Sequence, residues 1–245
     1  MNDQTKQKLK QLKLPGMLRA WKAMEETLSN GTMTHDEFLA CLIDAECEER
    51  YGRKVARLMS RAKFRLRAHI ADIDVASGRG IEKQLLARLS TSDWIRRSEN
   101  VIITGATGSG KSFLACALGT AACKCEMRVM YASMTKLVRA FKESLADNSL
   151  GRVMKQIARQ DLLVIDDFGL EPVNADVRRW LLEMVEDRYE IHSTIIATQL
   201  PVSTWPSLIG DPTFSDAIID RVVHNAHRIE LIAGKESRRV KKGLP

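Results

Sequence analysis

The chain has 245 residues, 44% of them hydrophobic, which is enough to bury a core for one mid-sized domain and a smaller appendage. Its longest apolar stretch, near residues 113–123, is too short to span a bilayer, and its polar first ten residues do not resemble a signal peptide. We therefore expect a cytoplasmic protein that does not enter membranes. The five cysteines form no CxxC pair, which indicates reduced thiols rather than a metal centre.

The net charge of +7 is unevenly distributed along the chain. Residues 1–80 carry 15 Lys and Arg against 11 Asp and Glu, residues 81–227 carry 17 against 18, and residues 228–245 carry 6 against 2. Two basic ends thus flank a nearly neutral middle. A charge asymmetry of this kind indicates a polyanionic partner, of which nucleic acid is the commonest.

The first 70 residues are predicted to form helices. A break at Pro15-Gly16 precedes an apolar stripe at helical spacing, and Thr34 with Glu37 forms a capping box at the start of a second helix. The stripe consists of Met17, Trp21, Met24 and Leu28. We therefore expect a small all-helical N-terminal domain over residues 1–75.

The second helix leads into a one-sided basic run. No acidic residue occurs from Tyr51 to Ala71, so the run itself offers no negative partner one helical turn away. A solvated helix face is one interpretation, and contacts with nucleic-acid phosphates, which we favour, are the other. The candidate DNA-binding residues are Arg50, Arg53, Lys54, Arg57, Arg61, Lys63, Arg65 and Arg67.

From about Asn100, short strands rich in β-branched residues alternate with helical segments. The predicted strands are residues 101–104, 128–132, 162–166, 194–198 and 228–232, and the predicted helices are residues 111–125, 135–146, 174–190 and 215–224. This alternation predicts an α/β fold with a five-stranded parallel sheet between helices. We expect a joint at Ser77–Gly80, so that the second domain spans residues 76–245.

A phosphate-binding loop is predicted directly after the first strand. Residues 105–112 read GATGSGKS and fit G-x-x-x-x-G-K-[ST], with a strand before and a helix after. We expect Lys111 to reach the β and γ phosphates of ATP and Ser112 to ligate Mg²⁺. A Gly-rich turn without chemical meaning is the alternative. The candidate ATP-binding residues are Gly105, Ala106, Thr107, Gly108, Ser109, Gly110, Lys111, Ser112 and Phe113.

The third predicted strand ends in two adjacent carboxylates, Asp166 and Asp167. Buried like charges are costly unless a cation neutralises them, and the Mg²⁺ of a bound nucleotide supplies one. We expect Asp166 to hold this metal through water. We expect Asp167 to orient or deprotonate the attacking water, a role most often given to the longer Glu, so turnover without a partner should be slow.

Two further polar residues are candidates for the reaction. Gln199 follows a strand expected between the two nucleotide-binding strands, where it either contacts the attacking water or γ-phosphate or simply ends the strand. Arg221 lies on a short amphipathic helix. It is either a surface ion-pair partner or an arginine finger presented to the nucleotide of a neighbouring subunit.

With these residues in place, the chain resembles the AAA+ ATPases and, more closely, the IstB family of insertion-sequence transposition helpers, relatives of the DnaC-type helicase loaders. The resemblance covers nearly the whole length. It rests on LKLPGML near the start, ENVIITGATGSGKS, DLLVIDDFG, STIIATQLP, the Gly210-Asp211-Pro212 loop and DAIIDRVVHNAHRIEL. The tail KESRRVKK resembles the family's GES-x-R segment, with Lys235 where Gly is common, which adds Arg239 as a DNA-binding candidate. The basic charge of the tail adds Lys241 and Lys242.

The resemblance implies an ATPase of the bacterial cytosol or nucleoid that assembles on duplex DNA in its ATP form and recruits or activates a partner transposase. It also implies that Arg221 is the arginine finger, that Gln199 is a sensor residue, and that the N-terminal domain of residues 1–75 serves DNA binding and oligomerisation. A replicative helicase loader is the nearest alternative, disfavoured by the LPGM segment and the Gly-Asp-Pro loop. A monomeric P-loop kinase acting on a small molecule is an alternative of another class.

Overall fold

The computed structural model describes residues 3–28, 33–75 and 80–232. Its internal contacts divide the chain into two units, Met1–Arg57 and Leu58–Pro245. The sequence analysis placed the domain boundary near residue 75, whereas Leu58 already contributes to the core of the second unit. The predicted joint at Ser77–Gly80 lies outside the described residues, except for Gly80.

The described part of the N-terminal unit is helical, as predicted. Its helices are α1 (Asp3–Gln11), α2 (Pro15–Leu28) and α3 (His35–Ala62), the last of which continues into the second unit. Trp21 of α2 meets Phe38 of α3 edge to face, with ring centroids 5.0 Å apart. The capping box is confirmed, because Thr34 N donates to Glu37 Oε2 at 2.8 Å and Glu37 N donates to Thr34 Oγ1 at 3.3 Å.

A glycine and a buried carboxylate join α2 to α3. A Cβ at Gly16 would lie 2.4 Å from the carbonyl oxygen of Ala45, so only glycine allows the two backbones to approach this closely. Glu46 is 5% exposed, and its carboxylate accepts the N–H of Gly16 at 2.8 Å. A negative charge at the first turn of α2 also complements the helix dipole.

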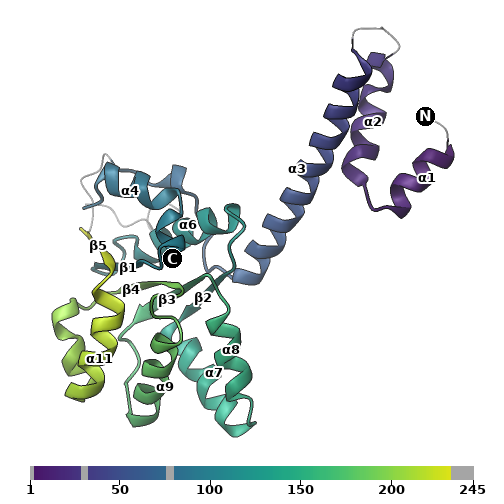
Figure 1. The fold of residues 1–245 in the computed structure, drawn as a ribbon. Coiled ribbons are helices and arrows are strands. Elements are labelled where there is room, and N and C mark those ends of the chain that lie inside the picture. Colours follow the sequence, from purple (N-terminus) through teal and green to yellow (C-terminus); the bar gives the residue numbers. More distant parts are fainter. Residues whose placement is uncertain (1–2, 29–32, 76–79, 233–245) are drawn as a thin grey trace. The chain divides into compact units, whose positions relative to one another are not determined.

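A five-stranded parallel sheet forms the centre of the second unit, in the order β2-β3-β4-β1-β5 (Figure 1). The strands are β1 (Asn100–Gly105), β2 (Val129–Ser133), β3 (Leu162–Phe168), β4 (Ser193–Thr198) and β5 (Ala226–Leu231). The predicted fold class is therefore confirmed. The predicted strand ends differ from the observed ones by no more than two residues.

Helices cover both faces of this sheet (Figure 1). The α-helices are α4 (Lys83–Ser90), α5 (Asp93–Arg96), α6 (Lys111–Lys124), α7 (Met134–Ala146), α8 (Leu150–Ala158), α9 (Ala175–Glu186), α10 (Trp205–Ile209) and α11 (Pro212–Val223), and the short 3₁₀ turns are η1 (Ile70–Asp72) and η2 (Val202–Thr204). The sequence analysis did not predict α8. Within the described part of the chain, no helix combines the length and apolarity needed to cross a membrane.

Alternate residues of the strands enter two separate apolar layers. Val101 and Ile103 of β1 pack on the side of α6, whereas Ile102 between them packs on the side of α7 and α9. Because both faces are covered, the central strands are almost continuously hydrophobic. Because the strands are parallel, the polar residues at or just after the carboxyl ends of β1, β3 and β4 lie at the same edge of the sheet. Thr104 and Phe168 both pair with Thr198 there.

Candidate nucleotide-binding site

The loop that joins β1 to α6 is tightly wound. Gly105 has φ +147° and Gly110 has φ +105°, backbone conformations that residues with a side chain rarely adopt. A Cβ at Gly105 would lie 2.4 Å from the carbonyl oxygen of Leu231, so this glycine also lets β5 approach. The loop ends at Lys111, the first residue of α6, where free N–H groups and the helix dipole favour an anion.

Lys111 is buried inside this loop. Its ammonium group donates to the carbonyl oxygens of Gly105 at 2.7 Å and Ala106 at 2.9 Å. Burial lowers the pKa of Lys111, and the two carboxylates of β3 oppose that shift. The buried hydroxyl of Ser109 has no hydrogen-bond partner among the described residues. A glycine cradle with an internal cation and an unpaired buried hydroxyl fits a bound polyphosphate.

Phe113 lies in the first turn of α6, beside the loop. It is half-buried and lines a cavity of about 20 Å³ together with Ser109, Gly110 and Leu231. The structure therefore brings all nine predicted ATP-binding residues into one continuous loop and helix turn.

Asp166 is fully buried near the end of β3, and both of its oxygens accept hydrogen bonds. Oδ1 accepts the backbone N–H of Asp167 at 2.9 Å, and Oδ2 accepts the hydroxyl of Tyr131, on β2, at 2.5 Å. Burial and the nearby Asp166 raise the pKa of Tyr131, so its hydroxyl remains a donor. The Asp166 carboxylate is thus fixed in position before any ligand binds.

Asp167 has a different environment because the strand bulges at this point. The pairing of β3 with β4 shifts between Ile165 and Phe168, and Asp167 has φ +57°, in the left-handed region. Its side chain is 27% exposed. The nearest cation is Arg65, whose Nη1 lies 3.2 Å from Asp167 Oδ2 and 4.0 Å from Asp166 Oδ2. The sequence analysis expected only a metal here and grouped Arg65 with the DNA-binding residues.

Gln199 follows β4, which lies between β3 and β1 as predicted. Its Oε1 accepts the hydroxyl of Thr107, in the phosphate-binding loop, at 2.8 Å. Gln199 is exposed. The structure therefore places the predicted sensor residue next to the predicted nucleotide site.

Arg221 lies at the opposite edge of the sheet. Its Nη2 lies 2.9 Å from Glu186 Oε1, and its Nη1 donates to the carbonyl oxygen of Ala217 at 3.0 Å. The side-chain amide of Asn100, the first residue of β1, donates to the carbonyl oxygen of Arg221 at 3.4 Å. A strand rises about 3.3 Å per residue, so β1 separates Arg221 from the phosphate-binding loop by roughly 17 Å. Arg221 cannot reach the nucleotide site of its own chain.

The predicted metal ligands fit Mg²⁺. Ser112 and Asp166 offer a hydroxyl and a carboxylate, which are hard oxygen donors. Among the described residues, no group of three or more His, Cys, Asp or Glu side chains could hold a metal by itself. Mg²⁺ in nucleotide sites needs only one or two protein ligands, because phosphate oxygens and water supply the others.

The predicted DNA-binding residues of the basic run are all exposed. Besides Arg65, Arg50 and Arg53 have acidic partners that the sequence analysis overlooked. Arg50 Nε lies 2.9 Å from Glu46 Oε1, and Arg53 Nε lies 3.5 Å from Glu49 Oε1, each one helical turn upstream. The acidic partners precede the run instead of lying within it. The tail candidates Arg239, Lys241 and Lys242 lie outside the described residues.

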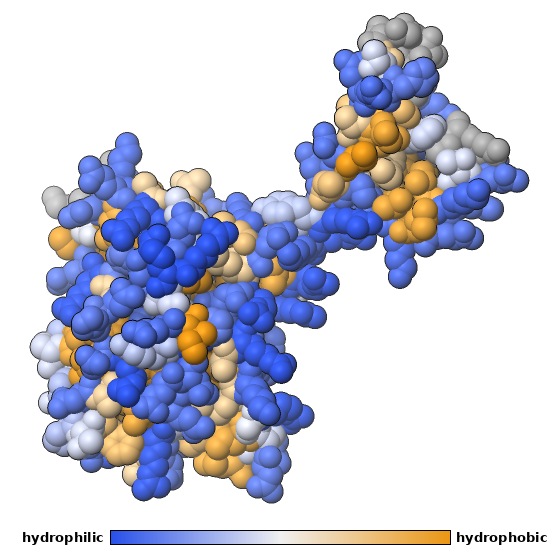
Figure 2. All heavy atoms as spheres, in the orientation of Figure 1, coloured by the Kyte–Doolittle hydropathy of each residue, from blue (hydrophilic) through white to orange (hydrophobic). Residues whose placement is uncertain are grey.

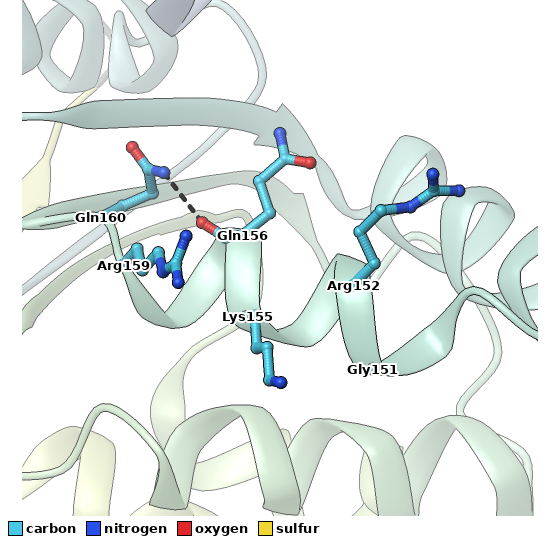
Figure 3. A pocket seen from close by; sticks show the side chains of 6 residues that line it. All are labelled: Gly151, Arg152, Lys155, Gln156, Arg159 and Gln160. Carbon is cyan, nitrogen blue, oxygen red and sulfur yellow. Dashed lines mark hydrogen bonds between the residues drawn. The ribbon is translucent and has the colours of Figure 1, made fainter.

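The sequence analysis also missed a basic surface on α8. Arg152 and Lys155 on α8 and Arg159, the residue that follows its end, line a hollow of about 410 Å³ (Figure 3). No acidic residue occurs between Ser149 and Gln160. The spacing of these three cations was the available signal, and it was missed because the helix itself was not predicted.

Comparisons with known proteins agree with this geometry. Residues 7–244 match the family described as IstB-like ATP binding protein. The chain is 43% identical over 238 residues to a protein of Sinorhizobium fredii named as the insertion sequence ATP-binding protein y4pL, with 96% of each chain covered. It is 37% identical over 205 residues to the IS1162 ATP-binding protein of Pseudomonas fluorescens, with 83% of this chain and 89% of the other covered.

Solved structures share the fold of a large part of the chain at lower sequence identity. DnaI matches with a TM-score of 0.58 and 16% identity over 72% of this chain and 93% of its own. The DnaC helicase loader matches with a TM-score of 0.54 and 18% identity over 67% of this chain and 96% of its own. With its P-loop, its parallel sheet and these relatives, the chain belongs to the IstB-like ATP-binding proteins of insertion sequences and has an AAA+ fold.

Proposed function

We propose that this protein is a DNA-binding ATPase that helps an insertion sequence transpose. In its ATP form it assembles on duplex target DNA, hydrolyses ATP slowly, and recruits or activates a partner transposase. The observation that carries the proposal is the convergence of the P-loop, the acidic pair and Gln199 at one edge of the sheet. Because the proposed helper acts on chromosomal DNA, we place it in the bacterial cytosol.

Each polar residue at this edge has a role in the proposed reaction. Lys111 leaves the carbonyl oxygens of its loop and binds the β and γ phosphates, and Ser112 and Asp166 hold Mg²⁺. The metal, when bound, neutralises charge on the phosphate oxygens. Asp167 orients the attacking water or accepts its proton, and Gln199 contacts that water or the γ-phosphate.

The position of Arg221 supports the self-association part of the proposal. Because it lies about one strand length from its own loop, it can act only on the nucleotide of a neighbouring copy. The helical unit also exposes apolar side chains that could serve assembly (Figure 2). Leu39 and Ile43, one turn apart on α3, are 53% and 45% exposed.

The proposed DNA interaction rests on charge. The exposed basic run and the cations of α8 would contact phosphates, and several subunits together would make binding additive and steeply salt-dependent. We expect the double substitution Lys155→Ala and Arg159→Ala to weaken binding of a labelled duplex about tenfold and to reduce its salt slope by about two. An unchanged salt slope would show that Lys155 and Arg159 do not contact the phosphates of the DNA.

Two other functions remain to be tested against this one. A replicative helicase loader would share the ATPase core, and the similarity to the DnaC loader shows only that the fold is shared. A monomeric small-molecule kinase would bind ATP but show no effect of DNA. The names of the relatives, which are insertion-sequence proteins, favour the transposition helper.

A pull-down in the presence of ATP separates these functions. The tagged protein is offered the transposase encoded beside it and the replicative helicase of the same host, with and without duplex DNA. We expect ATP-dependent capture of the transposase and no capture of the helicase. Capture of the helicase alone would overturn the proposal, and an ATPase rate stimulated only by a small-molecule acceptor would favour the kinase.

A further inference from the structure

An arginine from the segment after α3 lies against both acidic residues of the nucleotide site. Nη1 of Arg65 is 3.2 Å from Asp167 Oδ2, where it donates a hydrogen bond, and 4.0 Å from Asp166 Oδ2. A guanidinium group with a carboxylate forms a charge-assisted hydrogen bond, which is stronger than a neutral one. Arg65 therefore neutralises the same two carboxylates that the proposed function gives to Mg²⁺ and to the attacking water.

The backbone on either side of Arg65 is fixed to the core. Lys63, with φ +55°, turns the chain sharply after α3, and Ala62 and Ala68 are each 1% exposed. Phe64 packs on α6 at Gly119, where a Cβ would lie 2.5 Å from the phenyl ring. These contacts hold the segment while leaving the Arg65 side chain 51% exposed.

A second aromatic contact ties this segment to the buried carboxylate. The ring of Phe64 meets the ring of Tyr131 edge to face, with centroids 6.2 Å apart, and the Tyr131 hydroxyl donates to Asp166 Oδ2. Arg65 approaches the same oxygen of Asp166. The segment thus contacts the acidic pair directly through Arg65 and indirectly, by way of Tyr131, through Phe64.

Arg65 and a metal ion cannot use this site independently. Two cations a few ångströms apart repel each other strongly where the surroundings are partly buried and poorly screened. A divalent ion bound at Asp166 would face the guanidinium group across the same carboxylates. Binding of one cation therefore weakens binding of the other, and the metal must displace Arg65 or bind more weakly because of it.

We propose that Arg65 is a positioning residue that competes with Mg²⁺ for the Asp166–Asp167 pair and so sets the metal requirement of the nucleotide site. The inference rests on the proposed function, because it assumes an Mg²⁺-dependent ATP site. Release of Arg65 frees Asp167 for the attacking water. Since α3 ends at Ala62, three residues before Arg65, the helix that carries the basic run leads directly into this contact.

The test compares three variants for the dependence of ATP binding on Mg²⁺. Arg65→Gln removes the charge, Arg65→Lys keeps it, and Arg67→Gln removes an equal charge from an exposed neighbour two residues away. A fluorescent ATP analogue is held at fixed concentration while Mg²⁺ is titrated, and binding is read from the fluorescence. Thermal unfolding of each variant verifies that the fold is intact.

We expect Arg65→Gln to lower the half-saturating Mg²⁺ concentration by about 3- to 10-fold, since loss of one neighbouring charge is worth about one factor of ten. Arg65→Lys should return the midpoint towards the wild-type value, and Arg67→Gln should stay within about twofold of it. An unchanged or higher midpoint in Arg65→Gln would overturn the inference.

The outcomes also separate this inference from the proposed function. A wild-type protein that binds no ATP at any Mg²⁺ concentration would contradict both. A wild-type protein with Mg²⁺-dependent ATP binding, whose midpoint Arg65→Gln leaves unchanged, would contradict the role of Arg65 alone. A third outcome is that both Arg65→Gln and Arg67→Gln keep the wild-type half-saturating Mg²⁺ concentration and weaken duplex binding equally. That result would overturn the inference and make Arg65 a contact for DNA phosphates.

Discussion

The two edges of the parallel sheet differ in how their charged side chains are satisfied. At the amino edge, Arg188 is 2% exposed and donates to the carbonyl oxygens of Ile157 and Gln160. Burial lowers the pKa of Arg188 to about 9, which still leaves it charged at neutral pH. At the carboxyl edge, by contrast, the hydrogen bonds of Lys111 to described residues go to the carbonyl oxygens of its own loop.

The two edges also differ in where the backbone departs from regular strand geometry. Asn100 at the amino edge is held by ordinary strand geometry, and its side chain accepts the N–H of Thr194 at 2.8 Å. Asp167 at the carboxyl edge has a left-handed conformation within a bulge, which is unfavourable unless the surroundings impose it. Left-handed residues also occur at the amino edge, at Ser98 (φ +54°) and Glu190 (φ +57°), but these two lie in turns before β1 and β4. Asp167 differs because its left-handed conformation lies within a strand, at the same edge as the hydrogen bonds of Lys111 that a ligand can replace.

The largest expected effect comes from the carboxyl edge. Lys111→Ala should abolish measurable ATP binding, a loss of about 1,000-fold or more, because it removes the only cation inside the phosphate-binding loop among the described residues. Binding of a fluorescent ATP analogue measures this loss. Lys136→Ala, an exposed lysine on α7, is the matched control. Retained binding in Lys111→Ala would contradict the assignment of the site.

Asp167→Asn should separate binding from hydrolysis. Asparagine has nearly the same shape and tolerates the left-handed backbone at this position, so the bulge should persist. We expect ATP affinity within about twofold of wild type and a turnover rate lower by about 100-fold or more, because the group that activates water is lost. Phosphate release and analogue binding, measured on the same sample, check both halves of this expectation.

Arg221→Ala tests whether the amino edge acts on a neighbouring copy. Alone, the variant should lose about 100-fold of its DNA-dependent ATPase rate, whereas Arg179→Ala, on the exposed surface of α9, should not. A mixture of the Arg221→Ala and Asp167→Asn proteins should recover activity. The Asp167→Asn subunits supply Arg221 to the nucleotide sites of the Arg221→Ala subunits, in which Asp167 is intact. Full activity of Arg221→Ala alone, or no recovery in the mixture, would show that Arg221 does not act between subunits.

The smallest expected effect concerns stability at the amino edge. The hydrogen bond from Arg97, followed by that of His227, lowers the pKa of Glu99 to about 2. A lowered carboxyl pKa stabilises the fold fully above the ordinary value of 4.5, and this contribution disappears as the pH falls from 4.5 towards 2. Glu99→Gln should therefore lower the free energy of unfolding by about 1 kcal/mol at pH 7 and by much less at pH 3. Urea unfolding at both pH values measures this, with Glu183→Gln as control.

Patterns that depend on neighbouring residues were predictable from the sequence. The P-loop follows from glycine spacing, and the strands follow from short β-branched runs, so five strands and the carboxyl-edge site emerged without the structure. The contact of Arg65 with Asp167 was not predictable, because the two residues are 102 positions apart. Charge counting within a window likewise missed Glu46 and Glu49, which lie just before the basic run.

The domain boundary illustrates a related difficulty. A change of composition near residue 76 suggested a joint there, but Leu58, Ala62 and Ala68 are small or apolar residues that belong to the same hydrophobic cluster as residues of α6 and the sheet, far along the chain. Short amphipathic helices such as α8 carry too few residues for their periodicity to be distinguished from a loop. Residues that depend on distant partners therefore need the three-dimensional structure.

Binding of duplex DNA in different nucleotide states tests the central claim most directly. The measurement is fluorescence anisotropy of a labelled duplex with Asp167→Asn protein, in ATP and in ADP, together with electron microscopy of the ATP sample. We predict tight binding and multi-subunit assemblies on DNA in ATP, with at least about tenfold weaker binding in ADP. Equal affinity in the two nucleotides, with single subunits in the images, would contradict an ATP-controlled DNA helper.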